Sequence, residues 1–332
     1  MFGAAQSIPD VLLEYRRALD VLDGLDIATA NTRLSRYIPI LEGIMANGVR
    51  RLADDDLHRA IATLLEVSDI VSIANLDRAL LAEPSVLAKL RTIRGGRDYP
   101  HDYEPGRQDA ARDNAFEFSA AAHLQEYDKF AGFSRTNGDL LAFDSEGAVR
   151  PVECKRATTP GAAQSLLRTG INQLEVQIHE HNALPGFVLM DMTPAIRATA
   201  DLVQADSEQG MLVTANRALR EFIIANRRVL QHGRGFPPSC LGVLLRLTVI
   251  GFIGETYNLR SATTWHAIDL QRENSAEGAS FRAFANGLSR FGVREYEEPS
   301  PLLQAIISAH FRPLQEFLDA TFEQRRAFPF EE

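Results

Sequence analysis

Cysteine is scarce in this 332-residue chain, which contains only Cys154 and Cys240. Two cysteines supply neither a disulfide framework nor a cysteine zinc cluster, and such low usage is typical of the reducing cytoplasm. Long apolar runs are missing too, since none reaches the roughly eighteen residues that a membrane-spanning helix needs. Residues 1–6 lack the basic start and the apolar core of a signal peptide. The sequence therefore predicts a cytoplasmic protein with no membrane partner.

The chain also lacks an excess of positive charge, because its formal net charge is −9. Any binding to nucleic acid must therefore come from a local basic surface. One candidate surface is a predicted helix over residues 194–230, where Arg217, Arg220 and Arg227 recur close to one face. We assign Arg220 and Arg227 to contacts with a phosphate backbone. The alternative is a solvated helix face whose charges are offset by nearby acidic residues.

Three common catalytic and nucleotide-binding motifs are absent from the sequence. There is no Walker loop, no Gly-x-Gly-x-x-Gly following a strand and no Gly-x-Ser-x-Gly elbow. The sequence therefore gives no support to a nucleotide-driven motor, a dehydrogenase or a serine hydrolase.

Apolar residues make up 45% of the chain, enough for a sizeable core and for two or three domains. Apolar side chains recur at helical spacing over residues 7–94, which predicts a helical N-terminal region covering residues 1–96. These stripes form the core of a helical bundle or, alternatively, a surface for a homo-oligomer or a partner protein. Glycine, proline and aspartate crowd residues 95–106, and this loop composition predicts a domain boundary.

The centre of the chain, residues 107–270, is predicted to be an α/β domain. Its first elements are expected in the order helix 109–127, strand 130–135, a two-stranded hairpin over 137–156, helix 160–181 and strand 186–192. A strand–helix–strand crossover of the kind expected at its end makes a parallel pair of strands.

Helix and strand patterns alternate in the rest of the chain. We expect one long helix over residues 194–230, with a break near Gly210. A very apolar run over residues 240–250 predicts a packed strand, and residues 263–270 are expected to pair with it. Residues 271–332 return to helical spacing and are predicted to form a helical C-terminal tail.

The functional prediction rests on the hairpin over residues 137–156. Polar and apolar side chains alternate from Asp139 to Phe143, which is the period of a strand. Residues 144–147, Asp-Ser-Glu-Gly, are typical of a tight turn, because Asp and Ser cap the backbone and Gly147 accepts a positive φ. The chain then returns as a second strand alongside the first.

Three charged side chains are expected to converge at one end of this hairpin. Glu153 and Lys155 are two residues apart on a strand and point to the same face, while Cys154 points to the other. Once the hairpin closes, Asp139 lies close to that pair. Neighbouring carboxylates repel unless they bind a proton or a cation, and hard oxygen ligands suit Mg²⁺. With Lys155 to orient or activate a water, the predicted chemistry is metal-assisted attack on a phosphodiester.

The order of these residues resembles the active-site motif of the PD-(D/E)XK nuclease superfamily. The matching segments are Gly-Asp at residues 138–139 and Glu-Cys-Lys-Arg at residues 153–156. Upstream, Arg-Asp-Asn-Ala-Phe-Glu-Phe at residues 112–118 resembles the first core helix of the family. The proline in the family's name is absent, since a glycine precedes the aspartate. The resemblance covers residues 109–192, roughly a quarter of the chain.

The resemblance implies a restriction-endonuclease-like fold, in which helices flank a mixed sheet. It also implies an endo- or exonuclease that depends on Mg²⁺, with Mn²⁺ as a substitute. Asp139 and Glu153 are then expected to hold the metal, and Lys155 to position or deprotonate the attacking water. Glu117, on the first core helix, is expected to help hold the metal directly or through water.

The substrate implied by the resemblance is DNA, in restriction, phage defence or repair. Arg156 of the motif and Gln173, on the helix after the lysine strand, are assigned to substrate binding. One alternative is an RNA-directed nuclease, which the motif does not exclude. Another is a non-catalytic nucleic-acid-binding or scaffold protein on a nuclease fold, which would predict a missing site residue. The last alternative is an exposed hairpin with scattered charges and no site at all.

Overall fold

The structure is a computed structural model of the chain. It describes residues 8–47, 54–96, 109–135, 138–197, 203–226, 237–254, 258–269, 275–288 and 294–295. All of these lie in one compact unit, Met1–Glu295. The predicted boundary loop lies mostly outside the described residues, so the division into residues 1–96, 107–270 and 271–332 stays a prediction.

The N-terminal region is helical, as predicted. Its elements are α1 (Ile8–Asp23), α2 (Arg33–Asn47), α3 (Asp54–Ala74), α4 (Arg78–Leu81), α5 (Pro84–Leu90) and the 3₁₀ helix η2 (Arg91–Arg94). Pro84 occupies the first turn of α5, where a backbone N–H would have no partner within the helix. No helix in the described part of the chain combines the length and the hydrophobicity that crossing a bilayer requires.

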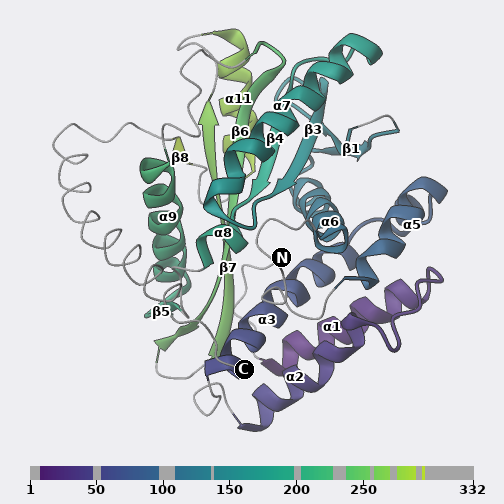
Figure 1. The fold of residues 1–332 in the computed structure, drawn as a ribbon, viewed down its shortest axis with the longest axis vertical. Helices are drawn as coiled ribbons and strands as arrows, with labels where there is room; N and C mark the ends of the chain where they lie inside the picture. The colour runs from purple at the N-terminus through teal and green to yellow at the C-terminus, as the bar shows by residue number, and fades with distance from the viewer. Residues whose placement is uncertain are drawn as a thin grey trace, which may run out of the picture. The chain divides into compact units, whose positions relative to one another are not determined.

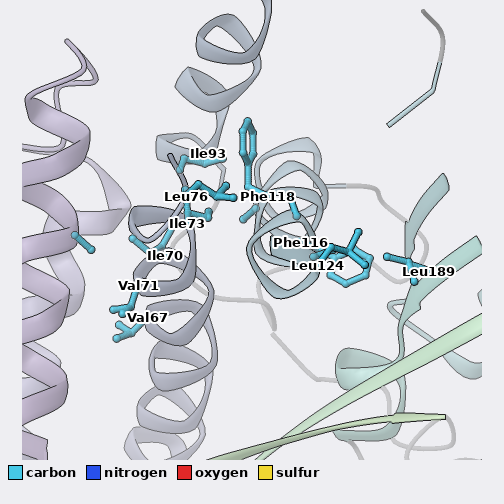
Figure 2. Close-up of a cluster of buried hydrophobic side chains, with 14 of the residues drawn as sticks. Val67, Ile70, Val71, Ile73, Leu76, Ile93, Phe116, Phe118, Leu124 and Leu189 are labelled. Carbon is cyan, nitrogen blue, oxygen red and sulfur yellow. The ribbon is translucent and has the colours of Figure 1, made fainter. Parts of the chain in front are cut away.

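Helix α6 (Ala110–Glu126) packs against both the N-terminal helices and the sheet. Its aromatic side chains point in both directions (Figure 2). Phe116 lies toward Leu189 of the sheet, and Phe118, on the side of the N-terminal helices, also packs on Phe133 at the edge of the sheet, with the ring centroids 4.8 Å apart. Because α6 is covered on both sides, a polar side chain on it, such as Glu117, is held inside the protein.

The sheet is mixed and has eight strands in the described part of the chain. They are β1 (Phe130–Phe133), β2 (Leu140–Phe143), β3 (Val149–Arg156), β4 (Gly186–Asp191), β5 (Val203–Ala205), β6 (Cys240–Ile253), β7 (Asn258–Asp269) and β8 (Arg294–Glu295). Their order is β1-β2-β3-β4-β6-β7-β8, and β5 pairs with β6. Strands β3, β4 and β6 are parallel neighbours, and the hairpin β2–β3 and the pair β6–β7 are antiparallel. The predicted α/β class, with helices flanking a mixed sheet, is confirmed.

Helices cover both faces of this sheet, as strand β4 illustrates. Phe187 stacks on Phe284 of α11 (Ala276–Gly287), with the ring centroids 4.4 Å apart. The next residue, Val188, contacts the crossover helix α7 (Pro160–His181), which lies along β3 and β4 (Figure 1). Successive side chains of a strand point to opposite faces, so α11 and α7 lie on opposite sides of the sheet. The rest of the predicted C-terminal tail lies outside the described residues.

The single long helix predicted over residues 194–230 is wrong. The chain instead forms α8 (Thr193–Arg197), strand β5 and α9 (Glu208–Ala225). Strand β6 extends past the end of β4, so the backbone N–H and C=O groups at its far end need other hydrogen-bond partners. Strand β5 provides these partners by pairing with residues 251–253 of β6. Ser207 then caps α9, its hydroxyl accepting a hydrogen bond of 3.1 Å from the N–H of Gly210. The predicted break at Gly210 is therefore the start of a new helix.

Candidate active site

The predicted hairpin is present as β2, β3 and a tight turn between them. Asp144 closes the turn, because its Oδ1 accepts hydrogen bonds from the backbone N–H groups of Glu146 and Ala148, at 2.8 and 2.9 Å. Gly147 has a φ of 81°, a backbone conformation that glycine adopts without a steric penalty. The turn predicted from the sequence therefore sets the register in which β2 and β3 pair.

The register of the two strands places Asp139 beside Glu153. Leu140 of β2 pairs with Val152 of β3, so Asp139, one residue before β2, comes level with Glu153. Its carboxylate is fixed there, because Oδ2 accepts a hydrogen bond of 2.8 Å from the backbone N–H of Cys154.

Lys155 joins the two carboxylates. Its Nζ lies 2.9 Å from Oε2 of Glu153 and 3.4 Å from Oδ2 of Asp139. It also donates a hydrogen bond of 3.0 Å to the backbone carbonyl of Cys154. The structure thus brings together the three residues on which the motif depends.

Glu117 reaches this group through Lys89, a residue to which the sequence patterns gave no role. The Nζ of Lys89, near the end of α5, forms an ion pair with Oε2 of Glu117 and lies 3.5 Å from Oδ1 of Asp139. The other oxygen of Glu117, Oε1, is buried and has no hydrogen-bond partner among the described residues. One signal could have found Lys89: of 35 lysine and arginine residues, only Lys89, Lys129 and Lys155 are lysines, and two of them meet here.

Helix α7 contributes a glutamine to the site, but at a different position from the predicted Gln173. The amide Nε2 of Gln177 donates a hydrogen bond of 2.5 Å to Oε1 of Glu153. Gly138 lies directly against this amide, since a Cβ there would come within 2.6 Å of Nε2. A side chain at position 138 would therefore displace the amide of Gln177. Gln173 lies one helical turn earlier, and its buried Oε1 has no hydrogen-bond partner within the described residues.

These side chains form a carboxylate–lysine chain, Glu117–Lys89–Asp139–Lys155–Glu153, in which each lysine bridges two carboxylates. Both ends of this series of side chains are buried, and its middle lies nearer solvent. The side-chain exposed fraction is 4% for Glu117, 33% for Lys89, 19% for Asp139, 11% for Lys155 and 0% for Glu153. A ligand from solvent therefore meets Lys89 and Asp139 first.

The carboxylate–lysine chain contains three carboxylates and only two ammonium groups, and burial makes the uncompensated negative charge costly. Burial, and then the charge of Asp139, raise the pKa of Glu153 to about 8 and that of Glu117 to about 7. Burial opposes the charge on Lys155 and Lys89 as well, but the neighbouring carboxylates outweigh it and raise the pKa of both lysines. Three carboxylates facing two ammonium groups therefore hold a proton near neutral pH or recruit a further cation.

Arg156 faces a second set of charges at the ends of the parallel strands. Its Nε lies 3.5 Å from Oδ2 of Asp191, which ends β4, and Arg246 of β6 approaches the other oxygen of Asp191 at 3.5 Å. Burial raises the pKa of the nearby Asp113 on α6 to about 6, although the charge of Arg156 opposes the rise. The side chain of Arg156 is only 12% exposed, so in this structure it is engaged with Asp191.

The predicted basic helix face is described only in part. Arg217 and Arg220 are exposed on α9, whereas Arg227 lies outside the described residues. Helix α9 packs on β5, β6 and β7, and the hairpin β2–β3 lies on the other side of β4 in the sheet. The structure therefore does not bring Arg220 to the carboxylate–lysine chain, and its contact with a phosphate backbone stays a prediction.

No family model matches this chain, and neither curated proteins nor solved structures give a match. The resemblance to the PD-(D/E)XK superfamily therefore rests on the motif residues and their geometry.

A divalent cation fits the donor chemistry of the carboxylate–lysine chain. Carboxylate oxygens are the ligands that Mg²⁺ and Mn²⁺ prefer, and Oε1 of Glu117 is a buried oxygen with no hydrogen-bond partner in the described part of the molecule. No group of three or more histidine, cysteine or acidic side chains placed to hold a metal ion is found among the described residues.

Proposed function

We propose that this protein is a metal-dependent nuclease that hydrolyses phosphodiester bonds, with DNA as its substrate. The observation that carries the proposal is the convergence of Asp139, Glu153 and Lys155 at one end of the β2–β3 hairpin. The element order adds support, because a helix, a strand hairpin and a crossover helix on a mixed sheet are what a restriction-endonuclease-like fold requires.

Each residue of the carboxylate–lysine chain has a role in this proposal. Asp139 and Glu153 would hold Mg²⁺ or Mn²⁺, and Glu117 would support the metal directly or through water. A bound metal would supply the Lewis acidity that polarises a phosphodiester and lowers the pKa of a bound water. Lys155, held between the two carboxylates, would orient the attacking water, and it would accept that water's proton only after losing its own to solvent, a loss that a bound cation favours by opposing the ammonium charge. Gln177 fixes the orientation of Glu153 from α7.

The substrate and the cellular setting follow from the resemblance and from the charge. A net charge of −9 does not attract nucleic acid over the whole surface, so binding depends on local arginines such as Arg156 and Arg220. We place the activity in restriction, phage defence or repair in the cytoplasm. A homo-oligomer or a partner protein, bound through the helical regions, would bring the enzyme to its substrate.

A cleavage assay on the purified full chain tests the proposed function. The substrates are linear duplex DNA, circular DNA, single-stranded DNA and RNA, each with Mg²⁺, with Mn²⁺ and with a chelator. We expect cleavage of DNA that requires the metal and is lost in Glu153→Gln. This variant should fold normally, because burial already favours the neutral form of Glu153.

Two results would contradict the proposal: no cleavage of any substrate, or equal cleavage by wild type and Glu153→Gln. Cleavage of RNA in place of DNA would support the RNA-directed alternative and change the substrate assignment.

A further inference from the structure

We propose that Lys89 is an internal counter-ion, which occupies the cation position between Glu117 and Asp139 and leaves it when a divalent cation binds. This inference rests on the proposed function, because it concerns the metal that the nuclease uses. The ammonium group of Lys89 bridges Oε2 of Glu117 and Oδ1 of Asp139. Both are oxygens that a metal ion at this site would bind.

The backbone of Lys89 is fixed by hydrogen bonds, whereas its side chain is partly exposed to solvent. The Lys89 carbonyl accepts hydrogen bonds from the N–H of Arg91 and from the hydroxyl of Thr92, the latter at 2.7 Å. The hydroxyl oxygen of Thr92 accepts one of 2.6 Å from the Asn114 side chain of α6, and Leu90 is fully buried. Because the side chain of Lys89 is 33% exposed, its ammonium group can move into solvent while α5 stays in place.

The charge balance favours such an exchange. Counted with all three carboxylates ionised and with Lys89 and Lys155 charged, the group carries one net negative charge, which a bound proton or a further cation must offset. A divalent cation in place of the Lys89 ammonium makes the group neutral. A divalent cation can also bind Oε1 of Glu117, the buried oxygen that has no hydrogen-bond partner in the described residues. Lys89 pairs only with the other oxygen, Oε2.

The residue type at position 89 fits a cation that must leave. Lysine is a compact point charge on a flexible stem, whereas arginine holds carboxylates with a rigid fork of donors. Nearly all of the basic residues in the protein are arginines, and only three of the 35 lysine and arginine residues are lysines. Two of these three lysines, Lys89 and Lys155, lie in the carboxylate–lysine chain. A compact ammonium group at position 89 suits a cation that a metal ion displaces.

The Mn²⁺ affinity of the full chain, measured by calorimetry without nucleic acid, tests the role of Lys89. We compare wild type with Lys89→Met, which keeps the stem but not the charge, and with Lys89→Arg, which keeps the charge. Lys129→Met is the matched control, since Lys129 lies outside the carboxylate–lysine chain. We expect Lys89→Met to bind Mn²⁺ on the order of tenfold more tightly, since a competing charge is removed. Lys89→Arg should bind no more tightly than wild type, and Lys129→Met should match it.

The outcomes separate this inference from the proposed function. Unchanged or weaker Mn²⁺ binding by a folded Lys89→Met, with binding by wild type intact, would overturn the counter-ion role alone. A purely structural role for Lys89 predicts weaker binding, the opposite direction. Absence of Mn²⁺ binding in both wild type and Lys89→Met would overturn the counter-ion role and the metal-dependent function together.

Discussion

Replacing Lys155 by alanine is expected to lower the rate of metal-dependent cleavage by about a hundredfold or more, while the affinity for DNA changes little. A positioned proton-transfer group typically contributes that much to a rate. Lys155 is held by contacts of 2.9 Å to Glu153 and 3.4 Å to Asp139, so it is fixed beside the two carboxylates that would hold the metal. Single-turnover rates at saturating Mg²⁺ measure the effect, with Lys129→Ala as the matched control.

Lys155→Arg separates the two ways in which this residue can act. Arginine keeps the charge but does not release a proton at usable pH, and its planar fork is wider than an ammonium group. Space beside Lys155 is limited, because its side chain is only 11% exposed. We expect the arginine variant to bind metal and DNA but to cleave about as poorly as the alanine variant. Turnover near the wild-type rate would contradict proton transfer by Lys155 and leave charge neutralisation as its role.

The largest loss of stability is expected for Arg246→Ala. The guanidinium of Arg246 donates hydrogen bonds to Ser119 at 2.9 Å and to Asp69 at 3.0 Å, and it approaches Asp191 at 3.5 Å. It also lies over the ring of Phe116, 4.9 Å from the centroid. Removing one partner of a buried charge group leaves the others uncompensated, which typically costs about 3–5 kcal/mol.

Urea denaturation at neutral pH measures this loss as the change in the free energy of unfolding. The control is Arg135→Ala, because the side chain of Arg135 is 85% exposed and its removal should change stability by less than about 0.5 kcal/mol. A loss below about 1 kcal/mol for Arg246→Ala would mean that Asp69 and Asp191 find other partners. The result bears on the site, because Asp191 also holds Arg156.

The hairpin could be predicted from the sequence because the residues that determine it are close together in the sequence. The alternation of side chains defines the strands, and Asp144 and Gly147 define the turn, so the register of Asp139 and Glu153 follows from adjacent residues. The same holds for α6 and α7, whose N-terminal caps and apolar spacing are contained in their own segments.

Contacts between distant segments could not be predicted in this way. Lys89 meets Asp139 only because α5 and η2 pack on α6, and no periodicity in residues 84–94 indicates that contact. Gln177 and Gln173 are four residues apart on α7, so spacing alone does not tell which of them reaches Glu153. Strand β5 was missed for a similar reason, since it forms to satisfy the far end of β6 rather than from its own three residues.

The position of a bound Mn²⁺ ion tests the central claim most directly. Crystals of the full chain grown with Mn²⁺ locate the ion by its anomalous scattering. The account predicts a peak in direct contact with the carboxylate of Asp139, with Glu153 or Glu117 as the second protein ligand. A peak at saturating Mn²⁺ that lies away from Asp139, or no peak in the carboxylate–lysine chain, would contradict it.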